Sequence, residues 1–176
     1  MQPEVRVNSR VIALFCLVVT LATSLFVVIL VAPHPSRGEP VSPIYGVKIP
    51  AGYRKWEFIA PAHEVGLNEL RVVVGNGIAI KAYQDGTLPF PDGTVLVKLA
   101  WTRVPSKEID EAFVPGSATT VQVMVKDSKR YAATGGWGFG RFVDGKPAPE
   151  AQHETCYSCH DVHVQNHDLV FTRWAP

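Results

Sequence analysis

The sequence Cys156-Tyr157-Ser158-Cys159-His160 organises the rest of the chain, because it places two thiols and an imidazole within one short segment. Two residues between the cysteines let both sulfurs reach the two vinyl groups of one porphyrin. The residue that follows brings an imidazole under the iron as the proximal ligand. The spacing therefore predicts one covalently attached haem c, bound through Cys156 and Cys159, with His160 as the iron ligand.

Three other chemistries use closely spaced cysteines. A redox disulfide of the thioredoxin kind normally begins a helix within a βαβ pattern, and no such pattern surrounds this segment. A zinc site would need further ligands, for which His153, His163 and His167 are near enough, but their spacings match no zinc-finger or ribbon template. A structural disulfide across so short a loop would constrain the unfolded chain little. Haem attachment is the favoured interpretation, and a disulfide or a zinc site stays open.

The composition limits the number of domains and the kind of partner. The chain has 176 residues, with 17 Lys and Arg against 16 Asp and Glu. This length allows one ordinary domain and an appendage. A nucleic-acid-binding surface needs clustered Lys and Arg, so the nearly neutral charge argues against a nucleic-acid partner.

The appendage is an apolar, uncharged run at residues 11–32. As a helix rising about 1.5 Å per residue, it would cross a hydrocarbon core of about 30 Å. Arg6 and Arg10 precede it and favour a cytoplasmic N-terminus with an exported C-terminal domain. A cleaved secretory signal is the alternative, although Leu30-Val31-Ala32-Pro33 lacks a small-x-small cleavage site. We expect residues 1–32 to tether the chain to the bacterial inner membrane on its periplasmic side, where c-type cytochromes mature.

The remaining sequence predicts a linker and one folded domain. Residues 33–44 contain four prolines and are expected to form an extended spacer. The haem domain then covers residues 45–176. Its alternating hydrophobic patterns and turn signals predict an α+β fold, a mainly antiparallel sheet with a few helices, preceded by the transmembrane or signal helix. The strands are expected at 55–60, with Trp56, Phe58 and Ala60 facing inward, and at 69–74, 94–102, 119–126 and 136–142, and the helices at 78–84 and 150–160.

The residue opposite the iron decides the function of such a haem. An electron carrier needs Met or a second His as a sixth ligand, whereas an enzyme or gas binder leaves that position open. Met124 is the only methionine after the apolar run, and either face of its strand could be the core. The other candidate ligands are His63, His153, His163 and His167.

Lys98 lies among apolar residues in Val95-Leu96-Val97-Lys98-Leu99-Ala100-Trp101. Alternation puts Lys98 on one strand face with Leu96 and Ala100. It is either a side chain that snorkels to water or a buried amine with a lowered pKa, which would be nucleophilic. The alternating glycines of Gly136-Trp137-Gly138-Phe139-Gly140 leave one strand face bare, for a flat group such as a porphyrin or for a bulge.

Several further segments make the chain resemble the cytochrome P-460 family, which includes the cytochromes c′-beta. The resemblance covers most of residues 45–174. It rests on the haem motif together with Tyr53-Arg54-x-Trp56, Phe90-Pro91-Asp92-Gly93, Lys98-Leu99-Ala100-Trp101, Met124-Val125-Lys126-Asp127, Gly136-Trp137-Gly138-Phe139 and Val170-Phe171-Thr172-Arg173.

The resemblance implies an antiparallel β fold, a homodimer and one five-coordinate c-type haem. In the P-460 enzymes a lysine is bonded to a meso carbon of the porphyrin, and hydroxylamine is oxidised with nitric oxide as a linked reactant. That catalytic lysine falls on Lys98, while Cys156, Cys159 and His160 take the thioether and proximal roles. The electrons would pass to an external cytochrome.

Two other functions stay open beside this one. The cytochromes c′-beta share the fold without the lysine bond and bind gases such as nitric oxide, so a non-enzymatic gas-binding protein is the alternative. A simple electron-transfer cytochrome is the third interpretation. For the enzyme, Glu57 and Asp127 are the candidate proton-handling carboxylates.

Overall fold

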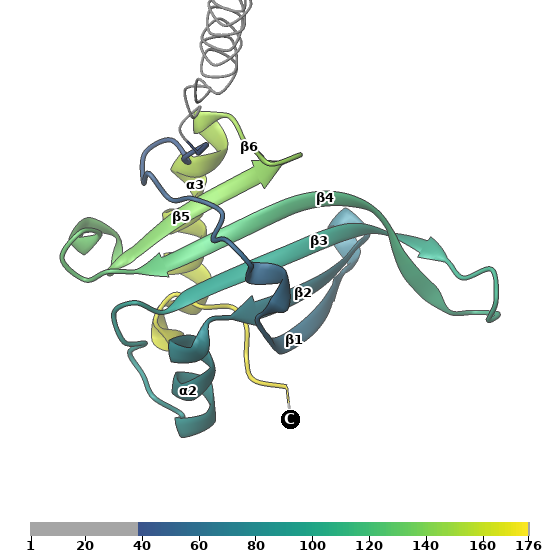
Figure 1. The fold of residues 1–176 in the computed structure, drawn as a ribbon, viewed down its shortest axis with the longest axis horizontal. Helices are drawn as coiled ribbons and strands as arrows, with labels where there is room; N and C mark the ends of the chain where they lie inside the picture. The colour runs from purple at the N-terminus through teal and green to yellow at the C-terminus, as the bar shows by residue number, and fades with distance from the viewer. Residues whose placement is uncertain (1–38, 176) are drawn as a thin grey trace, which may run out of the picture. The chain divides into compact units, whose positions relative to one another are not determined.

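The computed structural model describes residues 39–175, which form one unit built on a six-stranded antiparallel sheet (Figure 1). The strands follow one another across the sheet in chain order, from β1 to β6. The predicted membrane or signal segment at residues 1–32 lies outside the described residues, as does the first part of the linker. Within residues 39–175, no helix is both long and apolar enough to span a membrane.

The elements confirm the predicted α+β class with a mainly antiparallel sheet. Each predicted strand and helix has a counterpart, and the two-residue strand β6 is additional because so short a segment shows no alternation. The strands are β1 (Glu57–Glu64), β2 (Glu69–Gly75), β3 (Val95–Pro105), β4 (Phe113–Lys126), β5 (Trp137–Val143) and β6 (Lys146–Pro147). The α-helices are α2 (Gly77–Asp85) and α3 (Glu150–Val164), and the 3-10 turns are η1 (Tyr53–Lys55), η2 (Val65–Leu67), η3 (Ala132–Thr134) and η4 (Gln165–His167).

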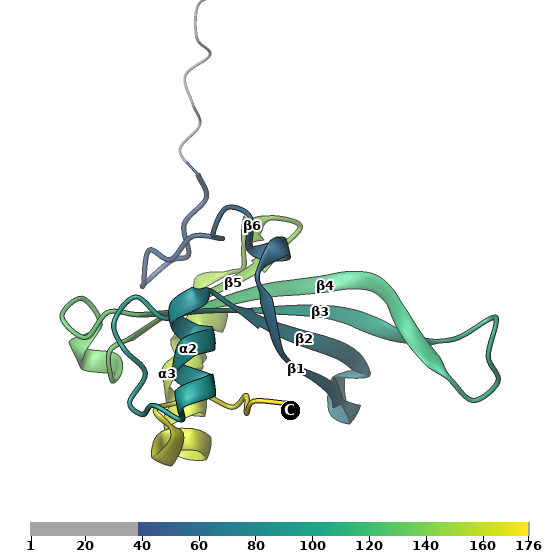
Figure 2. The same ribbon diagram turned by 60° about the horizontal axis from the view of Figure 1, so that its bottom comes forward.

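The sheet has an apolar cluster on each face. Helices α2 and α3 cover one face, and residues 39–56 cross the other (Figure 2). Alternation in β3 assigns Leu96 to the helix-covered cluster, and Val97 and Leu99 to the opposite one. Because Lys98 shares the parity of Leu96, it also faces the helices.

Strand β1 differs from the prediction. Ile59 is fully buried in the helix-side cluster, whereas Phe58 is 47 % exposed. The register of β1 against β2 shifts between Phe58 and Ala60. Such a bulge adds a residue to one strand and breaks the period of two, so the expected inward face was wrong.

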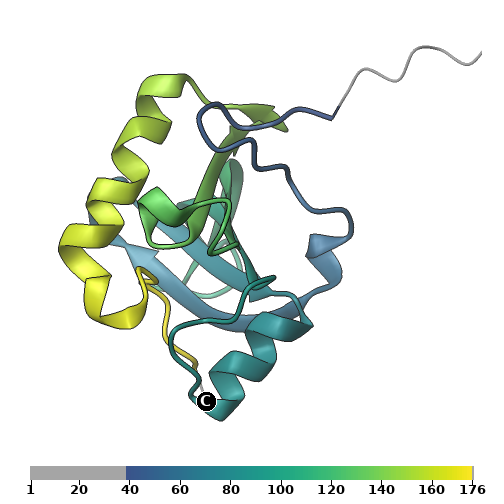
Figure 3. The same ribbon diagram turned by 90° about the vertical axis from the view of Figure 1, so that its left-hand side faces the viewer.

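The segments at the two ends of the described chain pack onto the sheet. The Ser42 hydroxyl, within the predicted linker, donates to the Phe139 carbonyl of β5 at 2.9 Å. At the other end, the chain turns through η4 after α3 and returns toward α2 (Figure 3). There the Tyr83 hydroxyl donates to the Thr172 carbonyl at 3.1 Å. The helix-covered face is therefore bounded by α2, α3 and this C-terminal segment.

Candidate functional site

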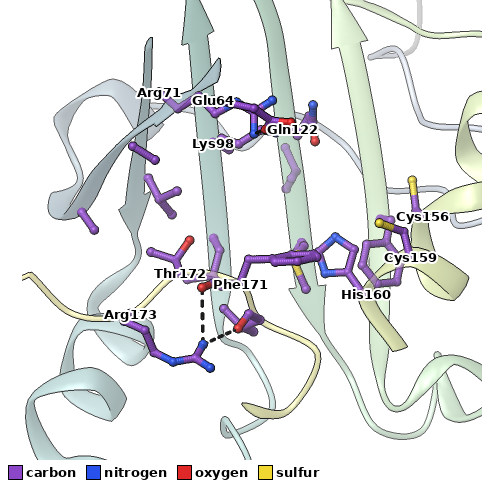
Figure 4. A pocket seen from close by; sticks show the side chains of 18 of the residues that line it. Glu64, Arg71, Lys98, Gln122, Cys156, Cys159, His160, Phe171, Thr172 and Arg173 are labelled. Atoms are coloured by element: carbon purple, nitrogen blue, oxygen red, sulfur yellow. Dashed lines mark hydrogen bonds and ion pairs between the residues drawn. The ribbon is translucent and has the colours of Figure 1, made fainter. Parts of the chain in front are cut away.

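A cavity of about 840 Å³ lies between the helix-covered face of the sheet, α3 and the C-terminal segment (Figure 4). It falls in the upper part of the range of roughly 300–1,000 Å³ that is usual for cofactor sites. Four residues singled out by sequence line it together: Lys98, Cys156, Cys159 and His160. The fold thus joins a lysine of β3 to the haem motif of α3.

Helix α3 presents both cysteines and the histidine at one site. Positions separated by three and four residues lie on one face of a helix, so Cys156 has Cys159 and His160 beside it. Cys156 is half-buried and Cys159 exposed, and both are free thiols rather than a disulfide. Burial raises the pKa of the Cys156 thiol, and the nearby Arg141 guanidinium opposes that rise.

The ring of His160 is oriented by three contacts. Its Nδ1 lies 2.6 Å from the Leu169 carbonyl oxygen, which can only accept a hydrogen bond, so Nδ1 carries the proton. The ring packs against Phe139 and Phe171, each with a centroid distance of 4.9 Å. Burial lowers the pKa of His160 and favours the neutral imidazole. Its Nε2 is therefore the nitrogen that can bind a metal.

Lys98 is a shielded amine without an anionic partner. Within the described chain, its amine forms no hydrogen bond or ion pair. Burial, together with the nearby Arg71 and Arg141 guanidiniums and against the opposing charge of Glu69, lowers the pKa of Lys98 from 10.5 to about 8. Of the two interpretations offered by alternation, the structure favours the buried amine.

The wall around Lys98 is polar and cationic. Lys98 pairs with Gln122 across β3 and β4, and Gln122 pairs with Arg141 across β4 and β5, so the three side chains form one row facing the cavity. The Arg141 Nε is buried and has no hydrogen-bond partner in the part of the chain that the structure describes. A polar or anionic group of a bound cofactor would provide the acceptor that this buried donor lacks.

The carboxylate of the cavity is not one that the sequence suggested. Neither Glu57 nor Asp127 lines the cavity, and Asp127 Oδ1 instead accepts from the backbone amides of a turn. Glu64 lines it and forms an ion pair with Arg71, whose guanidinium also bonds Glu69 at 2.9 Å. Glu64 of β1 meets Arg71 of β2 through the pairing of the two strands, so no local sequence signal reveals this pair.

The candidate sixth ligands are distributed unevenly. Met124 and His163 line the cavity, whereas His63, His153 and His167 do not. Both ring nitrogens of His153 are engaged, one by the Arg141 amide at 3.0 Å and the other by the Pro149 carbonyl at 3.2 Å. The zinc interpretation requires at least three His, Cys, Asp or Glu side chains placed to hold a metal ion. Among residues 39–175 there is no such group.

The alternating glycines of β5 have a packing role. A Cβ on Gly138 would overlap the Tyr131 ring, and one on Gly140 would approach Val47 at 3.1 Å. Tyr131 and Val47 both belong to the apolar cluster on the sheet face away from α3. These two glycines therefore accommodate protein side chains, so the interpretation that their bare face admits a porphyrin is not supported.

Comparison with known protein families gives a match over most of the described chain. The family model described as cytochrome P460 matches residues 50–172. That range runs from just before β1 into the C-terminal segment, and it includes Lys98 and the whole haem motif. Among curated proteins, no match to the chain was found.

Proposed function

This chain belongs to the cytochrome P460 family, a family of haem c cytochromes, and on that basis we propose that it oxidises hydroxylamine at a single covalently attached haem, with nitric oxide as a linked reactant. The electrons would leave to an external cytochrome. We further propose a homodimer on the periplasmic side of the bacterial inner membrane, tethered through residues 1–32.

The observation that carries this proposal is the meeting of Lys98 with Cys156, Cys159 and His160 in one cavity. In this proposal the two cysteines hold the porphyrin by thioether bonds. His160 binds the iron through Nε2 while Nδ1 donates to the Leu169 carbonyl. When bound, the haem would supply redox-active iron able to take up electrons from a small nitrogenous substrate.

Lys98 is the residue on which the oxidase proposal depends. Because its pKa is lowered to about 8, roughly a tenth of the Lys98 amine is neutral at pH 7, far more than for an ordinary lysine with a pKa of about 10.4. A neutral amine without a partner is available to bond to a meso carbon of the porphyrin, a step in which one N–H and the meso C–H are lost and a peroxide, as external oxidant, takes up the two electrons and two protons. The bond would change the electronics of the haem, which is one of the few ways a protein can tune it.

Protons released by the substrate need a way out of the cavity. Glu64 lines the cavity and its side chain is 43 % exposed, so it reaches both the site and water. We propose that it passes protons outward, with Arg71 holding its carboxylate in place.

The test is mass spectrometry of the trypsin-digested haem protein together with hydroxylamine turnover. If Lys98 is bonded, the haem peptide containing Cys156 and Cys159 also carries the segment around Lys98, and cleavage after Lys98 is missing. Lys98→Arg should abolish that species and the turnover, whereas Lys81→Arg on exposed α2 should preserve both. A haem peptide without the Lys98 segment, in protein that still turns over hydroxylamine, would refute the role of Lys98.

A gas-binding function without turnover is the second candidate, and one observation favours it. Beside Lys98 the neighbouring strand carries the amide of Gln122, and the carboxylate of Glu64 is already paired with Arg71. If the pairing with Arg71 prevents Glu64 from taking up protons, no other carboxylate among the described residues that line the cavity can accept them. Reversible binding of nitric oxide or carbon monoxide, with an unmodified Lys98 and no hydroxylamine turnover, would select this function.

The electron-carrier interpretation requires a sixth ligand. Met124 pairs with Phe139, whose ring packs against His160, so it lies near the ring of the proposed proximal ligand. Rapid uptake of carbon monoxide by the reduced protein would exclude a carrier with Met124 bound to the iron.

A further inference from the structure

A buried ion pair joins the end of β4 to the segment after α3. The Lys126 amine lies 2.7 Å from Asp168 Oδ1 and 2.9 Å from Oδ2, and it also donates to the Gly135 carbonyl at 3.0 Å. Lys126 is 6 % exposed. Neither residue lines the cavity. The cytochrome function described above therefore gives this pair no role, although Lys126 lies within one of the segments that the chain shares with the family.

Asp168 lies in a turn that needs external support. Asp168 and Leu169 have φ angles of 48° and 64°, in the left-handed region that a residue such as Leu rarely adopts. Two such residues in succession persist only where surrounding contacts hold them. Besides Lys126, the Asp168 carboxylate accepts from the Phe90 amide at 2.8 Å. Charge-assisted bonds to two separate segments thus fasten this turn.

The fastened turn supplies the hydrogen-bond acceptor of His160. The carbonyl that accepts from His160 Nδ1 belongs to Leu169, the residue after Asp168. The Leu169 side chain is buried and packs against Gly135, whose own carbonyl is bonded to Lys126. Lys126 therefore bonds two neighbours of Leu169: Asp168, which precedes it in the chain, and Gly135, which packs against its side chain.

We propose that Lys126 and Asp168 form a positioning pair for the iron ligand: they hold the Leu169 carbonyl against His160 Nδ1. The inference rests on the proposed role of His160 as the axial ligand. When the ring nitrogen of a histidine that does not bind the metal donates a hydrogen bond, that bond fixes the tautomer and raises the basicity of the ligand. A more basic imidazole binds iron more strongly and favours the ferric state. Loss of the pair should weaken the iron–histidine bond and raise the midpoint potential.

The test uses the purified haem protein and two observables that a purely structural pair would not change. These are the iron–histidine stretching frequency of the ferrous protein, from resonance Raman spectroscopy, and the midpoint potential. We expect Asp168→Asn and Lys126→Met to lower the frequency and raise the potential. Lys126→Arg keeps the charge and should restore both toward the wild-type values.

The exposed pair Lys81–Asp85, with an N–O distance of 2.7 Å, gives the matched control. Asp85→Asn removes the same kind of charge on α2 and should leave the frequency and the potential unchanged. If Asp168→Asn does not accumulate as folded protein, the frequency and the potential are measured in Asp168→Glu instead. That variant keeps the charge but lengthens the side chain by one methylene, which displaces the carboxylate from Lys126.

Two failures can be told apart. If the ferrous wild-type protein shows no iron–histidine stretch, the five-coordinate iron bound to His160 that the inference rests on is wrong, and the inference falls with it. If the wild type shows the stretch, but the Lys126 and Asp168 variants keep its frequency and the potential while unfolding more easily, His160 stands as the ligand and the pair is only structural.

Discussion

Lys98 and Lys126 lie on adjacent strands, face the same side of the sheet and are both largely shielded from water, yet their surroundings differ. The Lys126 amine meets the Asp168 carboxylate at 2.7 Å. The Lys98 amine is under the electrostatic influence of the Arg71 and Arg141 guanidiniums and, across residues 39–175, forms no ion pair with a carboxylate. A buried charge is retained when it is paired, whereas an unpaired one is neutralised through a shift in pKa. One lysine is therefore suited to holding structure, and the other to forming a covalent bond.

The largest effect should come from removing the unpaired amine. We expect Lys98→Met to reduce the proposed hydroxylamine turnover to background, because no amine remains to modify the porphyrin. The free energy of unfolding should be unchanged or higher, since an apolar side chain replaces an unpaired polar group. Turnover is measured by reduction of an acceptor cytochrome and stability by urea unfolding. A Lys98→Met protein with wild-type turnover would contradict the role in covalent bonding that distinguishes Lys98 from Lys126.

Removing the paired amine should affect stability instead. Lys126→Met leaves the largely buried Asp168 carboxylate without its cation and with the Phe90 amide as its remaining partner, which costs on the order of 3 kcal/mol of unfolding free energy. The double variant Lys126→Met/Asp168→Asn should regain part of that loss, because no unpaired charge remains. Urea unfolding of the single and double variants tests this coupling. Losses that simply add would show that the pair contributes no interaction of its own.

The pKa difference should appear in the pH dependence of labelling. At pH 8 about half of the Lys98 amines are neutral, because its pKa is about 8, whereas an ordinary lysine with a pKa of about 10.4 is almost fully protonated. In chains whose Lys98 is not bonded to haem, its acylation rate should fall about tenfold per pH unit below 8 and level off above it. Peptide mass spectrometry over a pH series measures this rate. A rate that still rises tenfold per unit above pH 9 would refute the lowered pKa.

The smallest effect on stability is expected for an ion pair that is exposed to solvent. Asp85→Asn breaks the Lys81–Asp85 pair on the exposed face of α2 and should cost about 0.5 kcal/mol or less. Urea unfolding beside the Lys126 variants makes the comparison. A loss equal to that of Lys126→Met would mean that burial is not what distinguishes the two pairs.

The parts of the site that could be predicted from sequence are local. The cysteines and His160 form a contiguous motif, and alternation in β3 reduces the orientation of Lys98 to two choices. Alternation fails in β1, where a bulge reverses the face that Phe58 was expected to occupy. The Glu64–Arg71 pair could not be predicted either, because it depends on the pairing of β1 with β2.

The non-local support of His160 could also not be read from the sequence. Lys126 and Asp168 are separated by 42 positions, and each is an ordinary charged residue by itself. The resemblance to a family marks Lys126 as part of a shared segment without indicating its partner. Only the folded chain shows that this segment contacts the turn behind the proposed ligand.

The sequential order of the strands also has a consequence for how the protein assembles. Each strand pairs with the one before it, so the sheet forms from contacts between neighbours along the chain, which favour rapid folding. Helix α3 follows all six strands and closes the cavity that β1 to β5 line. We expect the sheet, with Lys98 already facing that cavity, to form while the haem motif is still undocked and open to the attachment machinery. Docking of α3 would then bring the bound cofactor to Lys98 as the last event of folding.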